Sequence, residues 1–230
     1  MSQIKSNLDL IKEKISNSAI KSGRTADDIT LIAVTKTHSP KLINEAIDLG
    51  VTDIGENKVQ EIMEKYDYVK PVRWHLIGHL QTNKVKYIID KVHMIHSVDS
   101  VHLMEEIDKQ AKKHNKVMKI LIQVNISGEE SKFGISPDEI NDFLTSAQAL
   151  KNVEVCGLMT ILPKVDTTIS LRLHFANIKK IYIDISKKKY NNIHMNYLSM
   201  GMSGDFELAI EEGSNMVRIG SAIFGNRNYI

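Results

Sequence analysis

The strongest constraint on this chain is an alternation of strand-like and helix-like segments along its length. Short runs of apolar and β-branched residues are typical of buried strands. Between them, apolar residues recur every three or four positions, as on one face of a helix. Strands are expected at residues 31–36, 53–56, 73–77, 94–98, 119–125, 153–160, 196–199 and 216–219. Helices are expected at residues 7–19, 39–50, 58–68, 83–90, 101–114, 136–147, 168–187, 205–212 and 221–224.

Eight strands that alternate with helices in a chain of 230 residues predict an α/β fold, a single (β/α)8 TIM barrel. The helix at residues 7–19 precedes this pattern and is an extra N-terminal helix. Nearly continuous apolar strands fit a parallel sheet that is covered on both faces. An open doubly wound sheet is the alternative, but it normally has fewer strands, and no Gly-x-Gly-x-x-Gly follows the first strand. Because no stretch resembles a linker, we expect one domain over residues 1–230.

Charge and composition disfavour several classes of protein. The chain has 30 basic and 28 acidic residues, and so lacks the basic excess that is typical of nucleic-acid binding. No apolar run approaches the length of a membrane span, and the N-terminus has no signal core. The single cysteine, Cys156, cannot form an intramolecular disulfide, and we expect it to pack as a small hydrophobe. These features predict a cytoplasmic protein that binds neither nucleic acid nor membrane.

The first strand ends in a lysine, Lys36, whose position needs an explanation. A lysine is costly to bury, so its stem could pack against the strand while its ammonium reaches water. Alternatively, Lys36 is a reactive amine in a pocket, where it could form a Schiff base. In a barrel, residues that follow the strands meet at one rim, which is where active sites lie.

The loops after the last two strands favour a phosphate site. Barrels often bind phosphate with these loops and the N-terminus of a short extra helix. Gly201 and Gly220 would allow a close backbone approach, and Ser203 and Ser221 supply hydroxyl donors. The simpler interpretation is that both Ser-Gly stretches are only turns. Neither contains the Gly-Lys-Ser/Thr of a P-loop.

A phosphate site beside a Schiff-base lysine suggests pyridoxal phosphate, and Arg218 fits that hypothesis. Arg218 lies within the strand at residues 216–219, so it could point into the barrel. One interpretation is a structural ion pair with Glu56. In the other, Arg218 donates to the pyridine nitrogen, where a permanent cation opposes protonation of the ring. The cofactor would then be a weaker electron sink.

The histidines do not predict a metal site. His75 and His79 have the spacing of a zinc helix, but they flank a strand end, where four residues span ~13 Å. Metal–ligand bonds are ~2 Å long, so the two side chains could not share one ion. His93 and His96 are expected on opposite faces of their strand.

Several sequence blocks carry a family resemblance. They are Ala33-Val-Thr-Lys36-Thr, Gly55-Glu-Asn57-x-x-Gln60-Glu, Trp74-His-Leu-Ile-Gly-His79-Leu-Gln-x-Asn-Lys84, Ser131-Lys-x-Gly134, Gly157-Leu-Met-Thr160, Leu198-Ser-Met-Gly-Met-Ser203-x-Asp-Phe-Glu-x-Ala209 and Val217-Arg-Ile-Gly-Ser-Ala-Ile-Phe-Gly225. From about residue 30 onward, the chain resembles the pyridoxal phosphate homeostasis protein family. Residues 163–189 show little of the pattern.

The resemblance implies a barrel related to the N-terminal domain of alanine racemase. It also implies roles for cofactor-binding residues: Lys36 as the covalent aldimine, Arg218 at the pyridine nitrogen, Ser203, Gly220 and Ser221 at the phosphate, and Asn57, Met200 and Gly201 lining the pocket. The implied function is to hold the cofactor for vitamin B6 homeostasis and amino-acid/keto-acid balance, with no established reaction. Its implied partners are apo-enzymes that require pyridoxal phosphate, and the expected state is a monomer.

Two other functions stay open at this point. A racemase-like enzyme that uses pyridoxal phosphate would need acid–base groups on both faces of the cofactor plane. The related racemase takes its second group from a further domain. A Schiff-base aldolase that acts on a phosphosugar would need no cofactor at all.

Overall fold

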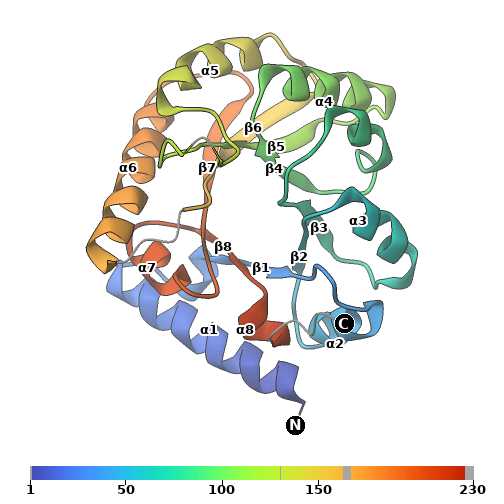
Figure 1. Cartoon of the computed structure of the whole chain (residues 1–230), viewed down its shortest axis with the longest axis vertical. Coiled ribbons are helices and arrows are strands. Elements are labelled where there is room, and N and C mark those ends of the chain that lie inside the picture. Colours follow the sequence, from blue (N-terminus) through green and yellow to red (C-terminus); the bar gives the residue numbers. More distant parts are fainter. Residues whose placement is uncertain (1, 130, 163–166, 226–230) are drawn as a thin grey trace.

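The chain folds into a closed barrel of parallel strands (Figure 1). The computed structural model describes residues 2–129, 131–162 and 167–225. The strands are β1 (Thr30–Val34), β2 (Asp53–Glu56), β3 (Arg73–Leu76), β4 (Met94–Val98), β5 (Met118–Gln123), β6 (Val153–Met159), β7 (Ile193–Met202) and β8 (Met216–Ile219). They follow one another in chain order around the barrel, and β1 pairs with β8 to close it. The predicted fold class is confirmed.

Helices form a ring outside the strands (Figure 1). The α-helices are α1 (Gln3–Lys21), α2 (Pro40–Asp48), α3 (Val59–Lys65), α4 (Val101–Lys113), α5 (Ile140–Gln148), α6 (Thr168–Ser186), α7 (Phe206–Glu211) and α8 (Ser221–Phe224). The 3-10 helices are η1 (Ala26–Asp28), η2 (Tyr66–Tyr68), η3 (Thr82–Tyr87) and η4 (Pro137–Glu139). Among the described helices, none has the length and apolar character needed to cross a bilayer.

The largest differences from the sequence-based expectation concern one helix and one strand. The helix predicted at 83–90 is the shorter 3-10 helix η3, which begins at Thr82 and ends at Tyr87. The seventh strand extends from Ile193 to Met202 on both sides of the predicted 196–199. The extension contains Gly201 with a φ of +93°. Strand propensities of the residues do not predict this conformation, which glycine adopts readily.

The N-terminal helix α1 lies outside the barrel and packs against α7 and α8 (Figure 1). It starts at Gln3, earlier than predicted, because the Ser2 hydroxyl caps it by accepting a hydrogen bond from the Lys5 N–H. Its Asn7 side chain donates to the Ile223 carbonyl at 2.8 Å. The helix therefore supports the two segments that follow β7 and β8.

The barrel interior contains an apolar cluster and a set of buried polar side chains. The cluster consists of Ile32, Met94, Leu121, Cys156, Met159 and Met216. These residues come from strands on all sides of the barrel, so the cluster fills its interior. Cys156 is buried in this cluster, which confirms that it packs as a small hydrophobe, and burial raises the pKa of its thiol to about 12. The buried polar residues beside the cluster include Asp53, His75 and His96.

We expect acid to destabilise this fold, because half-buried His93 is held neutral. Burial lowers the pKa of His93 from its ordinary 6.5 to about 4, and nearby positive charges, including those of Lys119 and Arg73, add to the effect. Between these values the unfolded chain binds more protons, so the free energy of unfolding rises with pH. Stability is complete above the unfolded-state pKa and falls as the pH drops toward 4. Urea unfolding at a series of pH values measures this slope.

A pair of variants tests whether His93 causes this dependence of the free energy of unfolding on pH. His93→Gln should make it shallower by up to about 1.4 kcal/mol per pH unit, the limit for one titrating group. His102→Gln, at an exposed position, should leave it unchanged. Identical slopes for wild type and His93→Gln would contradict the expectation.

Candidate functional site

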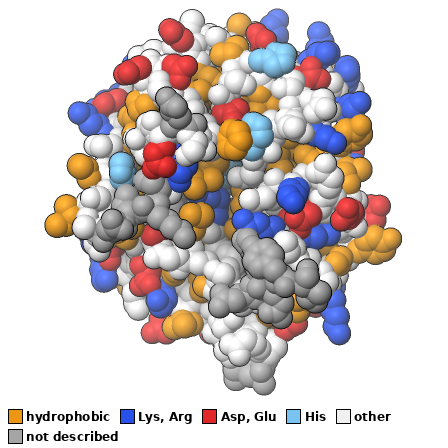
Figure 2. All heavy atoms as spheres, in the orientation of Figure 1, with side chains coloured by type: hydrophobic (Ala, Val, Ile, Leu, Met, Phe, Trp, Pro, Cys, Tyr) orange, Lys and Arg blue, Asp and Glu red, His pale blue; other side chains and the backbone are white. Residues whose placement is uncertain are grey.

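A cavity of about 370 Å³ lies at the carboxyl ends of the strands. Its lining consists of Val34, Lys36, Asn57, Ile77, Ile161, Met202, Ser203, Gly204, Arg218, Gly220 and Ser221. The charged members of this set are two cations, Lys36 and Arg218. Its apolar side chains are Val34, Ile77, Ile161 and Met202, which we call the apolar wall. Figure 2 shows basic side chains near the middle of the face it presents. The cavity therefore suits an anionic molecule with a partly apolar body.

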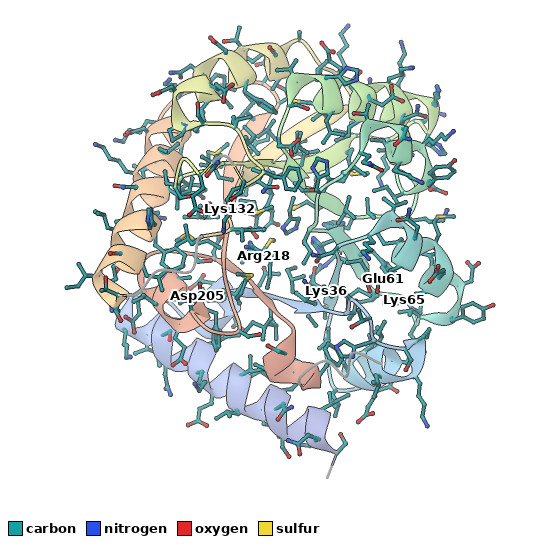
Figure 3. The ribbon with its side chains drawn as sticks, viewed as in Figure 1. Lys36, Glu61, Lys65, Lys132, Asp205 and Arg218 are labelled. Atoms are coloured by element: carbon teal, nitrogen blue, oxygen red, sulfur yellow. The ribbon has the colours of Figure 1, made fainter. Side chains whose placement is uncertain are left out.

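Lys36 is half-buried and follows β1 by two residues. Both of its chain neighbours are fixed by an ion cluster on the side of α3 (Figure 3). On one side, Lys65 Nζ donates to the Thr35 carbonyl at 3.0 Å. On the other, the Thr37 N–H donates to Glu61 Oε2 at 2.6 Å. Thr37 has a φ of +68°, an unfavourable value for a β-branched residue, so this bond holds a strained turn in place.

The ion cluster is largely buried. Lys65 Nζ also donates to Glu56 Oε1 at 2.9 Å and to Glu61 Oε2 at 2.7 Å. Burial raises the pKa of Glu56, because a carboxylate is poorly solvated there. Burial also acts to raise the pKa of Glu61, but hydrogen bonds from Lys65 and the Thr37 N–H outweigh it and lower the value. The cluster thus sets the backbone on both sides of Lys36.

Arg218 points from β8 into the barrel and is almost completely buried. Its Nη1 donates to Ser199 Oγ at 2.6 Å and its Nη2 to the Thr160 carbonyl at 2.8 Å. Burial lowers the pKa of Arg218 to about 10, and the charge of Asp205 opposes that effect. The guanidinium therefore remains a cation at neutral pH, held by two neutral acceptors.

The suggested ion pair between Arg218 and Glu56 is wrong. Glu56 instead bonds Lys65 and the Thr35 hydroxyl, which donates to it at 2.7 Å. The reason is the geometry of the barrel. Glu56 ends β2 beside α3, where Lys65 reaches it, whereas the acceptors of Arg218 come from β7 and the end of β6.

The loops after β7 and β8 are joined through one serine. Ser203 Oγ accepts hydrogen bonds from the Gly220 and Ala222 N–H groups at 3.3 and 3.4 Å. These bonds are long, so an anionic oxygen could replace the hydroxyl at the same donors. Asp205 holds the first loop in shape, because its Oδ1 accepts from the Met202 N–H. The two loops therefore lie together, and the phosphate site expected there stays a prediction.

The structure brings most of the predicted site residues together. Lys36, Asn57, Ser203, Arg218, Gly220 and Ser221 all line the cavity. Met200 and Gly201 do not belong to this lining. Met200 is fully buried in the main core. A Cβ on Gly201 would lie 2.6 Å from Ala209 Cβ, which shows that Gly201 lets β7 approach α7. Their assignment as cofactor contacts stays a prediction.

The histidines occupy positions that the sequence did not indicate. His75 lies inside the barrel, whereas exposed His79 bonds Asp99 and stacks on Phe133. The rings of His93 and His96 both contact that of His75, with centroids 5.6 and 5.1 Å away, so the expectation that they face opposite sides is wrong. His93 precedes β4 and does not follow its alternation. Within the described ranges, no group of His, Cys, Asp or Glu side chains could hold a metal ion.

Sequence reasoning missed two contributors to the site. The Glu61–Lys65 pair has the i, i+4 spacing of a helical ion pair, and that signal could have identified it. The apolar wall, with Ile161 and Met202, left no such signal. Residues 163–166, part of the segment without family pattern, lie outside the described residues, and most of the rest of that segment is α6.

Comparison with known proteins finds relatives that match nearly the whole chain. The profile of the family described as alanine racemase, N-terminal domain, matches residues 2–228. The chain is 41% identical to the pyridoxal phosphate homeostasis protein of Aquifex aeolicus, over 96% of this chain and 97% of that one. It is 37% identical to the protein of the same name from Escherichia coli K12, over 100% and 99%. PipY of Synechococcus elongatus, solved with PLP bound, superposes with a TM-score of 0.84 at 30% identity, over 97% of this chain and 100% of that one.

We expect Lys65→Met to destabilise the protein by about 3–5 kcal/mol, because it leaves Glu56 buried without its cation. Lys14→Met is the matched control, since Lys14 forms an exposed ion pair with Glu207 and should contribute less than about 1 kcal/mol. Urea unfolding of both variants measures the difference. Equal losses would show that the buried cluster contributes no more than a surface pair.

We expect Gly201→Ala to lower the free energy of unfolding by about 2–4 kcal/mol. The added Cβ meets Ala209, and the positive φ strains any residue with a side chain. Gly204→Ala, in the loop that follows β7, is the control, because its Cβ would meet no described atom within 4 Å. A small loss in Gly201→Ala, within about 0.5 kcal/mol of the control, would refute this structural role.

Proposed function

The chain belongs to the alanine racemase N-terminal domain family and, within it, to the pyridoxal phosphate homeostasis proteins, and from this premise we propose that it binds pyridoxal 5'-phosphate covalently through Lys36 and holds it for delivery. The observation that carries the proposal is the cavity itself, which has two cations, several hydroxyl and amide donors and an apolar wall.

The residues of the cavity fit this cofactor. The phosphate of the cofactor needs N–H and O–H donors, which the loops carrying Ser203 and Ser221 supply. The volume of about 370 Å³ lies within the range of small-molecule sites. Its flat ring suits the wall formed by Ile77, Ile161 and Met202. No described residue in the lining is a carboxylate that would repel the phosphate.

Each cavity residue has a distinct role in this proposal. When bound, the cofactor supplies an aldehyde that forms a C=N bond with a primary amine and releases water. Lys36 provides the amine, and the ion cluster around Lys65 fixes its backbone. Arg218 donates an N–H to the pyridine nitrogen, and its permanent charge disfavours ring protonation. Asn57, Gly220 and Ser203 complete the binding site.

This arrangement favours storage and delivery over catalysis. Racemisation needs acid–base groups on both faces of the cofactor plane. Among the described residues of the cavity, Lys36 and Arg218 are the titratable ones, and Arg218 is fixed at its own acceptors. An unprotonated ring is also a poor electron sink. We therefore propose that the protein has no reaction of its own and serves vitamin B6 homeostasis and amino-acid/keto-acid balance.

The proposed partners are apo-enzymes that require pyridoxal phosphate. We further propose that residues 1–230 act as one monomeric domain in the cytoplasm. The reduced thiol of the single cysteine, Cys156, is buried, which is compatible with a reducing compartment.

Absorbance spectroscopy tests the proposal. Purified protein loaded with pyridoxal phosphate should show a visible band that borohydride abolishes. Lys36→Ala should lack the band, and so should Lys36→Arg, which keeps the positive charge but has no condensing amine. Addition of an acceptor apo-enzyme should decrease the band while the activity of the acceptor appears.

Two results would overturn this function. Absence of a cofactor band in the wild-type protein would favour the aldolase hypothesis. Exchange of the α-proton of an added amino acid in deuterated water at enzymatic rates would favour the racemase-like hypothesis.

A further inference from the structure

A continuous chain of hydrogen-bonded side chains crosses the inside of the barrel and ends at Arg218. Its members are, in order, Arg73, Asp53, His75, His96, Ser199 and Arg218. We call it the interior chain. It begins at the first residues of β2 and β3, where Arg73 is half exposed, and it ends at the cavity on the opposite side of the barrel.

The distances show that each link is a hydrogen bond. Asp53 accepts from Arg73 Nε and Nη2 at 2.7 and 2.6 Å, and its Oδ1 lies 2.9 Å from His75 Nε2. His75 Nδ1 lies 2.9 Å from His96 Nε2, and His96 Nδ1 lies 3.2 Å from Ser199 Oγ. All members except Arg73 are buried. Water therefore competes little for these bonds.

The charge of Asp53 fixes the direction of the whole chain. Burial acts to raise the pKa of Asp53, but hydrogen bonds from His75, Arg73 and Thr52 outweigh it and lower the value, so Asp53 is a carboxylate that only accepts. His75 must then carry its proton on Nε2.

The remaining protons follow one from another. Burial lowers the pKa of His75, and it lowers that of His96 well below the ordinary value, so both rings are neutral at pH 7. A neutral ring has one donor and one acceptor. His75 Nδ1 therefore accepts from His96 Nε2–H, and His96 Nδ1 accepts from the hydroxyl of Ser199. Ser199 is left with only lone pairs to offer Arg218.

We propose that the interior chain positions Arg218 in the cavity, and that the carboxylate of Asp53, on the far side of the barrel, sets the direction of its hydrogen bonds. The proposal rests on the proposed function, because the group that Arg218 would serve is the cofactor ring. Ser199 anchors Nη1 as an obligate acceptor, and the Thr160 carbonyl anchors Nη2. Both of these acceptors are neutral, and no carboxylate of a described residue bonds the guanidinium, which therefore turns its remaining donors and its charge toward the cavity.

The first experiment needs no cofactor. With ¹⁵N-labelled histidine, long-range ¹H–¹⁵N correlation spectra of cofactor-free protein at pH 7 report the tautomer of each ring. Both His75 and His96 should carry their proton on Nε2, with assignments from single His→Gln substitutions. A proton on Nδ1 of either ring, or a charged ring, would overturn the proposal even if the protein binds pyridoxal phosphate well.

Two variants at the far end of the interior chain separate the effect of the Asp53 charge from the effect of its ion pair with Arg73. Asp53→Asn, whose carboxamide can donate as well as accept, should release the tautomers and give mixed signals for His75. Arg73→Met keeps the carboxylate and should leave both tautomers unchanged. Fixed tautomers in Asp53→Asn would count against its directing role.

Variants at the near end test the effect on the cofactor site. Ser199→Ala should weaken pyridoxal phosphate binding about tenfold, as expected for loss of a hydrogen bond to a charged group, and should shift the visible band. Ser199→Thr keeps the hydroxyl and should restore both. Ser214→Ala is the matched control, since its buried hydroxyl bonds backbone carbonyls nearby but not the interior chain. Unchanged affinity and spectrum in Ser199→Ala would refute the positioning role, whereas a wild-type protein that binds no pyridoxal phosphate would refute the proposed function alone.

Discussion

The pairing of β1 with β8 is the contact on which the rest of the structure depends. It closes the sheet, and its register sets Ala33 opposite Ile219. Lys36 and the loop that starts at Gly220 follow these partners directly, so closure brings a lysine from the start of the chain beside a loop from its end. In an open sheet the two would lie at opposite edges. The same closure creates an interior that side chains must fill. A series of polar side chains can therefore cross the barrel while it is shielded from solvent.

The protein buries charge in two different ways. Around Lys65, opposite charges meet directly, and the backbone on both sides of Lys36 is held by that cluster. Arg218 instead bonds neutral oxygens of Ser199 and Thr160. A direct carboxylate partner would cancel the charge of Arg218 and occupy its donors. Neutral anchors leave both available to a ligand, so the first arrangement gives rigidity and the second gives binding capacity.

The interior chain connects Arg218 to the far end of the barrel. A serine hydroxyl or a neutral imidazole can act in either direction, so such a network is ambiguous unless one end is fixed. Asp53 supplies that fixed end, with Arg73 and Thr52 keeping it ionised. In this way the carboxylate of Asp53 sets the direction of the hydrogen bonds that reach the cavity, although no described residue of the cavity lining is an acid.

The sequence by itself determined the alternating elements, the closed barrel and six cavity residues. Apolar periodicity and short motifs are local properties, which can be recognised before the packing of the elements is known. It also placed Lys36 and Arg218 at one rim. Only the tertiary structure decided that Lys65, not Arg218, pairs with Glu56, that Gly201 serves the contact of β7 with α7, and that His75 and His96 join one chain. The physical reason is that these contacts join residues from different strands and helices. Their partners are set by the stagger and closure of the barrel, which no local pattern encodes.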